Sequence, residues 1–247
     1  MPPYHKTNRP WWYRPSLNGI DLSDPAVVGL INSAHLSIQA KSVTDAVDII
    51  NRMFMISPVA TTLGANARVL DGKDTGWADC RFEIWKRSHD TRGIIARVLG
   101  KPLRIGLPKR YFASIWDYLN DVASFPFILN DPTNALAIGT GLYWRDARIK
   151  FINNTPVVEF RSLSKQNTLM KDLALFAFVI GRVIWSQQNQ EPLTPIQQVR
   201  KEKQRAEKLG KNAFSGEFVK NEITKARQGL SALGLLDTFT ENLLRML

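Results

Sequence analysis

Alternating apolar and polar residues mark four short stretches of the chain as candidate β-strands. They are residues 35–41, 81–85, 148–151 and 157–161. Side chains of a strand point alternately to opposite faces, so this pattern is typical of a half-buried strand. The last two stretches flank the turn Asn153-Asn154-Thr155-Pro156. The sequence therefore predicts a hairpin at this point.

Helical spacing of apolar residues follows the first predicted strand. Ser42-Val43-Thr44-Asp45 predicts a helix start, and Pro58 is expected to interrupt that helix before a further helix through Ala60 and Leu63. Residues 110–123 form an amphipathic pattern, and residues 168–185 an apolar one that predicts a largely buried helix. Residues 191–209 are rich in Lys and Arg, which predicts a solvated helix. Residues 210–247 predict two more helices separated near Gly234.

Composition fits a folded chain with a core, because 44% of its 247 residues are hydrophobic. No apolar run reaches transmembrane length, so we expect no membrane contact. The segment from Met1 to Pro15 lacks the apolar stretch of a secretory signal. Cys80 is the sole cysteine, which excludes an intrachain disulfide and makes a cytoplasmic location the default.

The pattern divides the chain into an extended N-terminal arm (1–32), a core (33–190) and a basic helical C-terminal segment (191–247). Four prolines oppose helix in the first fifteen residues. The arm carries Trp11, Trp12 and Tyr13, which need a surface to pack on. These side chains either pack the arm against its own domain or dock on another subunit.

A formal charge of +11 admits three explanations. They are nucleic acid, an acidic partner chain, or an anionic substrate such as a nucleoside triphosphate. The basic residues are spread along the chain, apart from the region after Gln190, and no zinc-ligand spacing, basic zipper or RNA-binding aromatic signature is visible. This disfavours nucleic acid as the partner.

Two groups of residues could carry chemistry. Glu159 and Arg161 lie two residues apart and so project to one face of their strand, where Arg148 could join them. A carboxylate suits magnesium and guanidinium groups suit phosphate. The alternative is a surface cross-strand ion pair.

The second group is Arg81, Glu83 and Trp85, which follow a glycine-bearing turn and could orient an anionic substrate. The alternative is a loop followed by an ordinary strand. His35, Ser37 and Gln39 share one face of the first strand, where a lone histidine is more often structural than a ligand.

In their order, these pieces resemble the glutamate–cysteine ligase family. The family motifs "P-x-x-x-A-L-x-A-N-S-P" and "R-x-E-x-W" have counterparts in residues 57–66 and 81–85, and "V-R-L-K" and "L-E-x-R" in 148–150 and 159–161. The strand from His35 stands where the family has "H-V-H-V-G", and Ala226-Arg227-Gln228-Gly229-Leu230 resembles "A-R-x-G-L". The resemblance covers residues 33–247.

The resemblance implies an α+β, glutamine-synthetase-like fold, in which a curved antiparallel sheet holds all four predicted strands and the helices cover one face. It implies an enzyme that joins a carboxylate and an amine substrate into an amide through an acyl phosphate, with ATP and Mg²⁺. By this resemblance Arg148 and Arg161 act in catalysis and, with Arg81, contact the nucleotide. Glu159 binds the metal, and His35, Arg81 and Trp85 contact the substrate.

The sequence also departs from the family pattern. Nothing before Ser33 resembles the family's closely spaced glutamates, "G-x-E-x-E", and Ser164 stands where the family usually has Asp. The metal cluster is therefore incomplete within this chain. Either a partner in a homo- or hetero-oligomer supplies the missing strands, or the chain is a noncatalytic structural or regulatory subunit. A basic nucleic-acid-binding protein is the remaining alternative.

Overall fold

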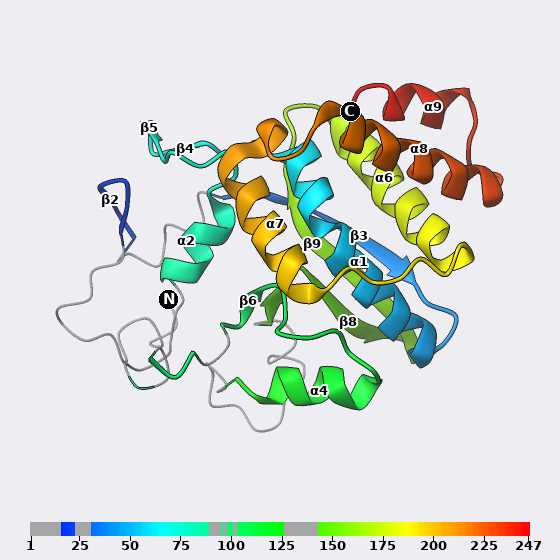
Figure 1. Ribbon diagram of the computed structural model, residues 1–247, viewed down its shortest axis with the longest axis horizontal. Coiled ribbons are helices and arrows are strands. Elements are labelled where there is room, and N and C mark those ends of the chain that lie inside the picture. Colours follow the sequence, from blue (N-terminus) through cyan, green and yellow to red (C-terminus); the bar gives the residue numbers. More distant parts are fainter. Residues whose placement is uncertain (1–15, 23–30, 89–94, 96–97, 101–102, 126–142) are drawn as a thin grey trace.

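A three-stranded antiparallel sheet lies at the centre of the fold, with the order β3-β9-β8. The computed structural model describes residues 16–22, 31–88, 95, 98–100, 103–125 and 143–247. Figure 1 shows the helices α1, α6 and α7 in front of this sheet. Helices and antiparallel strands thus form an α+β fold, as predicted.

The hairpin predicted from the Asn-Asn turn is confirmed. β8 (Ala147–Ile152) pairs with β9 (Thr155–Ser164), and Arg148 lies directly opposite Glu159. Asn153 and Asn154 connect the strands with φ angles of 49° and 62°. Asparagine tolerates this left-handed conformation, and two such residues in sequence make the tight turn that suits twisted strands.

The strand predicted at residues 35–41 is confirmed as β3 (Ser33–Gln39), which pairs with the other edge of β9. The register shifts between Ala34 and Leu36, so His35 lies at a bulge. Its neighbour α1 (Val43–Gly64) begins as predicted, with the Ser42 hydroxyl accepting a hydrogen bond from the Asp45 amide.

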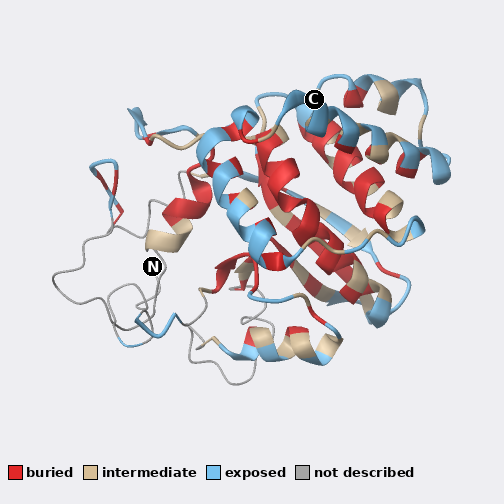
Figure 2. Ribbon diagram, in the orientation of Figure 1, coloured by how far each residue is buried: buried red, intermediate tan, exposed pale blue. Residues whose placement is uncertain are grey.

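The interruption predicted at Pro58 is wrong, because α1 continues through it without a break. Every residue of α1 from Ile49 to Thr62 is buried, and the helix packs against the sheet, α6 and α7. We infer that this packing outweighs the hydrogen bond that a proline removes from a helix. Figure 2 shows α1 as the most thoroughly buried helix in the view.

The two faces of the sheet differ in character. Val158, Phe160 and Ser162 of β9 face α1 and are fully buried. Glu159 and Arg161 alternate with them and therefore project from the opposite face. The apolar core thus lies between the sheet and α1, and the side chains of Glu159 and Arg161 lie on the other side.

The strand predicted at residues 81–85 is wrong, because Arg81–Ser88 form the helix α2. Glu83 forms ion pairs with Lys86 at 3.0 Å and with Arg87 at 3.2 Å, three and four residues further on. These spacings bring side chains together on a helix and not on a strand. The central sheet therefore holds three of the four predicted strands among the described residues.

Short strand pairs flank the central sheet. β1 (Ser16–Leu17) and β2 (Ile20–Asp21) form a hairpin within the segment expected to be an extended arm, and β4 (Val69–Leu70) pairs with β5 (Lys73–Asp74). β6 (Ile105–Gly106) pairs in parallel with β7 (Trp144–Arg145). Trp11, Trp12 and Tyr13 lie outside the described residues.

The C-terminal helices share the core with the rest of the fold. Two helices precede them in the chain, α4 (Ile115–Ala123) and α6 (Leu169–Gln188). The C-terminal helices themselves are α7 (Ile196–Leu209), η3 (Gly210–Asn212), α8 (Gly216–Ala232) and α9 (Thr238–Leu244). The helix predicted at 110–123 begins later, at Ile115, where the Ser114 hydroxyl caps it. No helix among the described residues is long and apolar enough to cross a membrane.

The solvated helix predicted at 191–209 is wrong for one face of α7. Lys203 is only 3% exposed and Glu207 only 1%. The ammonium of Lys203 lies 3.1 Å from the Asp146 carboxylate and donates hydrogen bonds to the hydroxyls of Thr61 and Ser162. A buried charge needs such partners, so α7 is fastened to the core by polar contacts as well as apolar ones.

Candidate functional site

Glu159 is the centre of a charged cluster on the polar face of the sheet. Its side chain is buried, and Arg148 donates to its Oε2 from the neighbouring strand at 3.0 Å. Lys150 lies 2.7 Å from the same oxygen. His35 Nδ1 lies 3.2 Å from Oε1, and Arg161 Nε lies 3.7 Å from it. The structure therefore brings together Glu159, Arg148 and Arg161, which the sequence grouped, and adds His35, which the sequence pattern had placed in a separate group.

The cluster holds Glu159 in its charged form. Burial alone would raise the pKa of this carboxyl group, but hydrogen bonds from His35, Lys150 and Arg148 outweigh it, so the pKa lies well below its usual range. Three permanent positive charges, on Arg148, Lys150 and Arg161, surround this single negative charge. The cluster is thus net positive.

Arg161 combines burial with incomplete pairing. Its Nη1 donates a hydrogen bond to the Tyr143 carbonyl oxygen at 2.8 Å, while its Nε is buried without a hydrogen-bond partner among the described residues. Burial, and then the positive charge of Arg148, lower the pKa of Arg161 to about 10. An anion near this guanidinium would relieve both effects.

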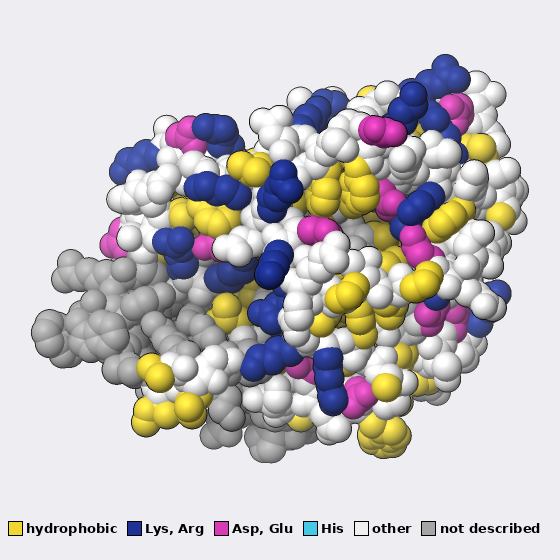
Figure 3. Space-filling view, viewed as in Figure 1, with side chains coloured by type: hydrophobic (Ala, Val, Ile, Leu, Met, Phe, Trp, Pro, Cys, Tyr) yellow, Lys and Arg dark blue, Asp and Glu magenta, His cyan; other side chains and the backbone are white. Residues whose placement is uncertain are grey.

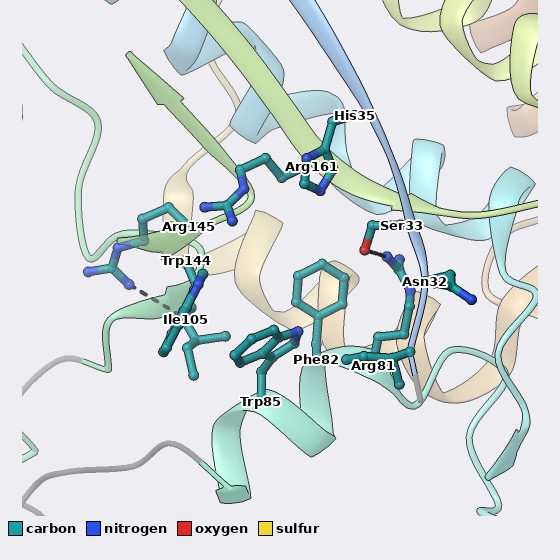
Figure 4. Close-up of a pocket in the computed structure, with 11 residues that line it drawn as sticks. Asn32, Ser33, His35, Arg81, Phe82, Trp85, Ile105, Trp144, Arg145 and Arg161 are labelled. Atoms are coloured by element: carbon teal, nitrogen blue, oxygen red, sulfur yellow. Dashed lines mark hydrogen bonds between the residues drawn. The ribbon is translucent and has the colours of Figure 1, made fainter. Parts of the chain in front are cut away.

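A cavity of roughly 240 Å³ adjoins the cluster. His35 of β3 and Arg161 of β9 line one side of it, and Figure 4 shows Phe82 and Trp85 of α2 across from them. Trp85 packs on Trp144 with ring centroids 4.4 Å apart and the planes inclined by 37°. The cavity therefore has a cationic side and an aromatic side.

Arg81 lines the same cavity, but its guanidinium is occupied by the protein. It is only 2% exposed and forms a bidentate ion pair with buried Asp79, at 2.9 Å and 2.7 Å. The remaining donors reach the Ser33 hydroxyl and the carbonyls of Ser162 and Leu163, each at 2.8 Å. All five N–H groups are then used, so this geometry favours a structural role that ties α2 to β3 and β9.

Arg148 contacts Glu159 and is not among the residues that line the cavity. Several residues of the site were not singled out from the sequence. Lys150 could have been recognised from the sequence, because it lies two residues from Arg148 and therefore projects from the same face of the strand. Phe82, Ile105, Trp144 and Arg145 had no such signal, because the helix α2 and the pairing of β6 with β7 place them at the cavity.

The metal expected at Glu159 would find few protein ligands. Among the described residues no three His, Cys, Asp or Glu side chains gather in a way that could hold a metal ion. Both carboxylate oxygens of Glu159 already contact basic groups. Further ligands would have to come from outside the described part of the chain.

Comparison with known proteins agrees with the motifs on which the site rests. The family model of glutamate-cysteine ligase family 2 matches residues 25–217, which include β3, α2, β8, β9 and α7. No curated protein matches the chain. The family match spans well over half of the chain and contains every residue of the charged cluster. The chain therefore belongs to glutamate-cysteine ligase family 2.

Proposed function

We propose that the chain is an ATP-dependent carboxylate–amine ligase, or the sheet-bearing subunit of one, which forms an amide between two amino-acid substrates. The observation that carries this proposal is the charged cluster around Glu159 beside the aromatic-walled cavity. Family membership supports the ligase class. Nucleotide use, the acyl-phosphate route and the residue roles are parts of the proposal.

The charges of the cluster suit a triphosphate. Arg148, Lys150 and Arg161 exceed the single carboxylate of Glu159, and they all lie within 3.7 Å of its oxygens. Guanidinium groups match the geometry of phosphate oxygens, and the Nε of Arg161, which has no hydrogen-bond partner among the described residues, is a further donor. Arg148 and Arg161 are therefore the residues we propose to hold the phosphates and to neutralise the charge that develops during transfer.

The residues fit magnesium less completely. Glu159 is the only carboxylate of the cluster, and it would have to exchange contacts with basic groups for contacts with the ion. Magnesium usually keeps several water and phosphate ligands and needs only one or two carboxylates from the protein. We therefore propose Glu159 as one ligand and assign the others to phosphate oxygens, water or a partner chain.

The remaining site residues would bind and shield the substrates. In this family ATP activates the carboxylate as an acyl phosphate with release of ADP, and the amine then displaces inorganic phosphate. The packed rings of Trp85 and Trp144 cover one side of the cavity and would keep water from the activated carboxylate. His35 faces them and would contact a substrate. Arg81 would act indirectly, by holding α2 against the sheet.

We also propose that the sheet is completed by another chain. β3 hydrogen-bonds to β9 on one side, and within the described residues no strand pairs with its other edge. Natural proteins usually cover such an edge. A homo- or hetero-oligomeric partner that adds strands there could also add the carboxylates that the metal needs.

One observation favours the alternative of a noncatalytic structural or regulatory subunit. The cluster holds one carboxylate, which its cations already neutralise, and no three His, Cys, Asp or Glu side chains gather among the described residues to hold a metal ion. A subunit of this kind would keep the ion pairs and bind no nucleotide.

Calorimetric titration of Mg–ATP into wild-type protein and the Arg161→Lys variant separates the two functions. Lysine keeps the charge but cannot present the planar fork, so we expect affinity to fall about tenfold, the effect of losing one charge-assisted hydrogen bond. Arg110→Lys is the control, because Arg110 is exposed and distant in the sequence from the cluster. Equal affinities in all three proteins, or no binding by the wild type, would refute the ligase proposal.

A further inference from the structure

A second and larger cavity lies on the helical side of the molecule. It measures roughly 600 Å³ and is bounded by α2, by the segment from β6 to Lys109, and by α7. Cavities that hold small ligands have volumes of about 300–1,000 Å³. The two cavities share Ile105 and Arg145 but have different walls, because this one is lined by α7 and not by β3 or β9.

One face of α7 turns toward this cavity. Gln197, Arg200, Lys201 and Gln204 all line it, at spacings of three and four residues. Such spacing places side chains on the same side of a helix. Figure 3 shows Lys and Arg side chains gathered over the lower part of α7 and beside it, in the middle of the view. The cavity is thus lined by cations and by amide groups that can donate hydrogen bonds.

The charges around this cavity do not balance. Among its lining residues Lys86 pairs with Glu83 and Glu207, while Lys203 and Arg145 pair with Asp146 and Asp121, which lie outside the lining. The structure gives no carboxylate partner to Arg200 or Lys201 among the residues it describes. The ammonium of Lys109 donates to the Gly100 carbonyl, at 2.8 Å.

Arg200 shows the electrostatic consequence. Partial burial, and then the positive charge of Arg145, lower the pKa of the Arg200 guanidinium. Like charges that face one cavity repel each other, although water screens part of this repulsion because Arg200, Lys201 and Lys109 are exposed. An anion with several negative charges would remove this repulsion, and a guanidinium and two ammonium groups would supply its hydrogen bonds.

We propose that this cavity binds a small polyanion of the phosphate class, held by Arg200 and Lys201 of α7 and by Lys109 of the segment that follows β6. The site is separate from the charged cluster around Glu159 and does not depend on the ligase proposal. Its ligand would be free phosphate, pyrophosphate or a phosphorylated metabolite, which share the same recognition chemistry. A ligand there would join α7 to the segment that carries β6, and β6 also lines the first cavity.

Calorimetric titration of inorganic pyrophosphate without magnesium tests the site. All proteins carry Arg161→Gln, which weakens binding at the sheet face. A double variant, the site pair, adds both Arg200→Gln and Lys201→Gln to this background. The control pair is Arg205→Gln with Lys211→Gln, which removes the same charge from exposed residues that do not line the cavity.

We expect the site pair to lose about a hundredfold in affinity, or about tenfold for each charge-assisted contact, while the control pair changes less than about threefold. Lys109→Gln, on a different element, should lose about tenfold. Thermal melting confirms that each variant is folded. Equal losses in the two pairs, or no saturable binding by the Arg161→Gln chain, would overturn the proposal. Neither result bears on Mg–ATP binding, which tests the ligase proposal separately.

Discussion

Replacing Glu159 with glutamine removes the negative charge from among three permanent cations while it keeps the size of the side chain. The nitrogen atoms of these cations that lie nearest to the Glu159 carboxylate are Lys150 Nζ at 2.7 Å, Arg148 Nη2 at 3.0 Å and Arg161 Nε at 3.7 Å. At about 3 Å and an effective dielectric constant of about 20, one such pair is worth roughly 5 kcal/mol before desolvation is subtracted. Glutamine leaves those cations partly buried and repelling each other.

The expected loss of stability follows from the exposure of the partners. Removing one member of a fully buried ion pair costs about 3–5 kcal/mol. The side chains of Arg161, Arg148 and Lys150 are 15%, 19% and 29% exposed, so water screens part of the loss. We therefore expect about 3 kcal/mol, the lower end of that range. For a chain of this size that corresponds to a fall in Tm of about 6–12 °C.

Thermal and urea denaturation measure this loss at neutral pH, with Glu217→Gln as the control because Glu217 is exposed on α8. The pKa of Glu159 is depressed in the folded protein, so its stabilisation is present above the unfolded pKa of about 4.3. It is lost as the pH falls below that value toward the folded pKa. The difference between wild type and variant should therefore shrink in acid. A variant as stable as the control at pH 7 would refute the buried cluster.

Two further predictions concern packing and assembly. An alanine at Gly229 would place its Cβ 1.9 Å from the Gly181 carbonyl oxygen, so Gly229→Ala should cost more than about 3 kcal/mol in urea denaturation. Gly216→Ala, with open space around it, should cost far less, and equal stabilities would contradict the close crossing of α6 and α8. Sedimentation velocity should show an oligomer, because β3 has an uncovered edge among the described residues, and a stable dilute monomer would count against the proposed partner.

The central sheet was predictable because its signals are local. The Asn153–Asn154 turn fixes the β8–β9 hairpin, and strand alternation then puts Glu159 and Arg161 on one face. The pairing of Arg148 with Glu159 follows from the same turn. The position of His35 beside Glu159, and with it the full geometry of the ion pairs, could not be predicted in this way. It depends on the pairing of β3 with β9, which are far apart in the sequence.

The failures have a common cause in tertiary contacts. The five residues from Arg81 to Trp85 alternate as a strand does, but so short a stretch also fits a helix. The helix packs at the sheet edge because Arg81 reaches Asp79 and the carbonyls of β9. Lys203 and Glu207 of α7 are charged residues in a basic segment, and nothing local distinguishes them from solvated ones. Their burial depends on partners that lie far away in the sequence.

The most direct test of the ligase proposal is calorimetric titration of ATP into wild type and Glu159→Gln, with and without magnesium, using the protein in its native assembly. If Glu159 is a metal ligand, the variant should bind Mg–ATP about tenfold more weakly, because a charged oxygen ligand is lost. The same variant should bind magnesium-free ATP at least as tightly as wild type, because a repelling negative charge is gone. Unchanged Mg–ATP affinity in the variant, or no ATP binding by the wild type, would contradict the proposal.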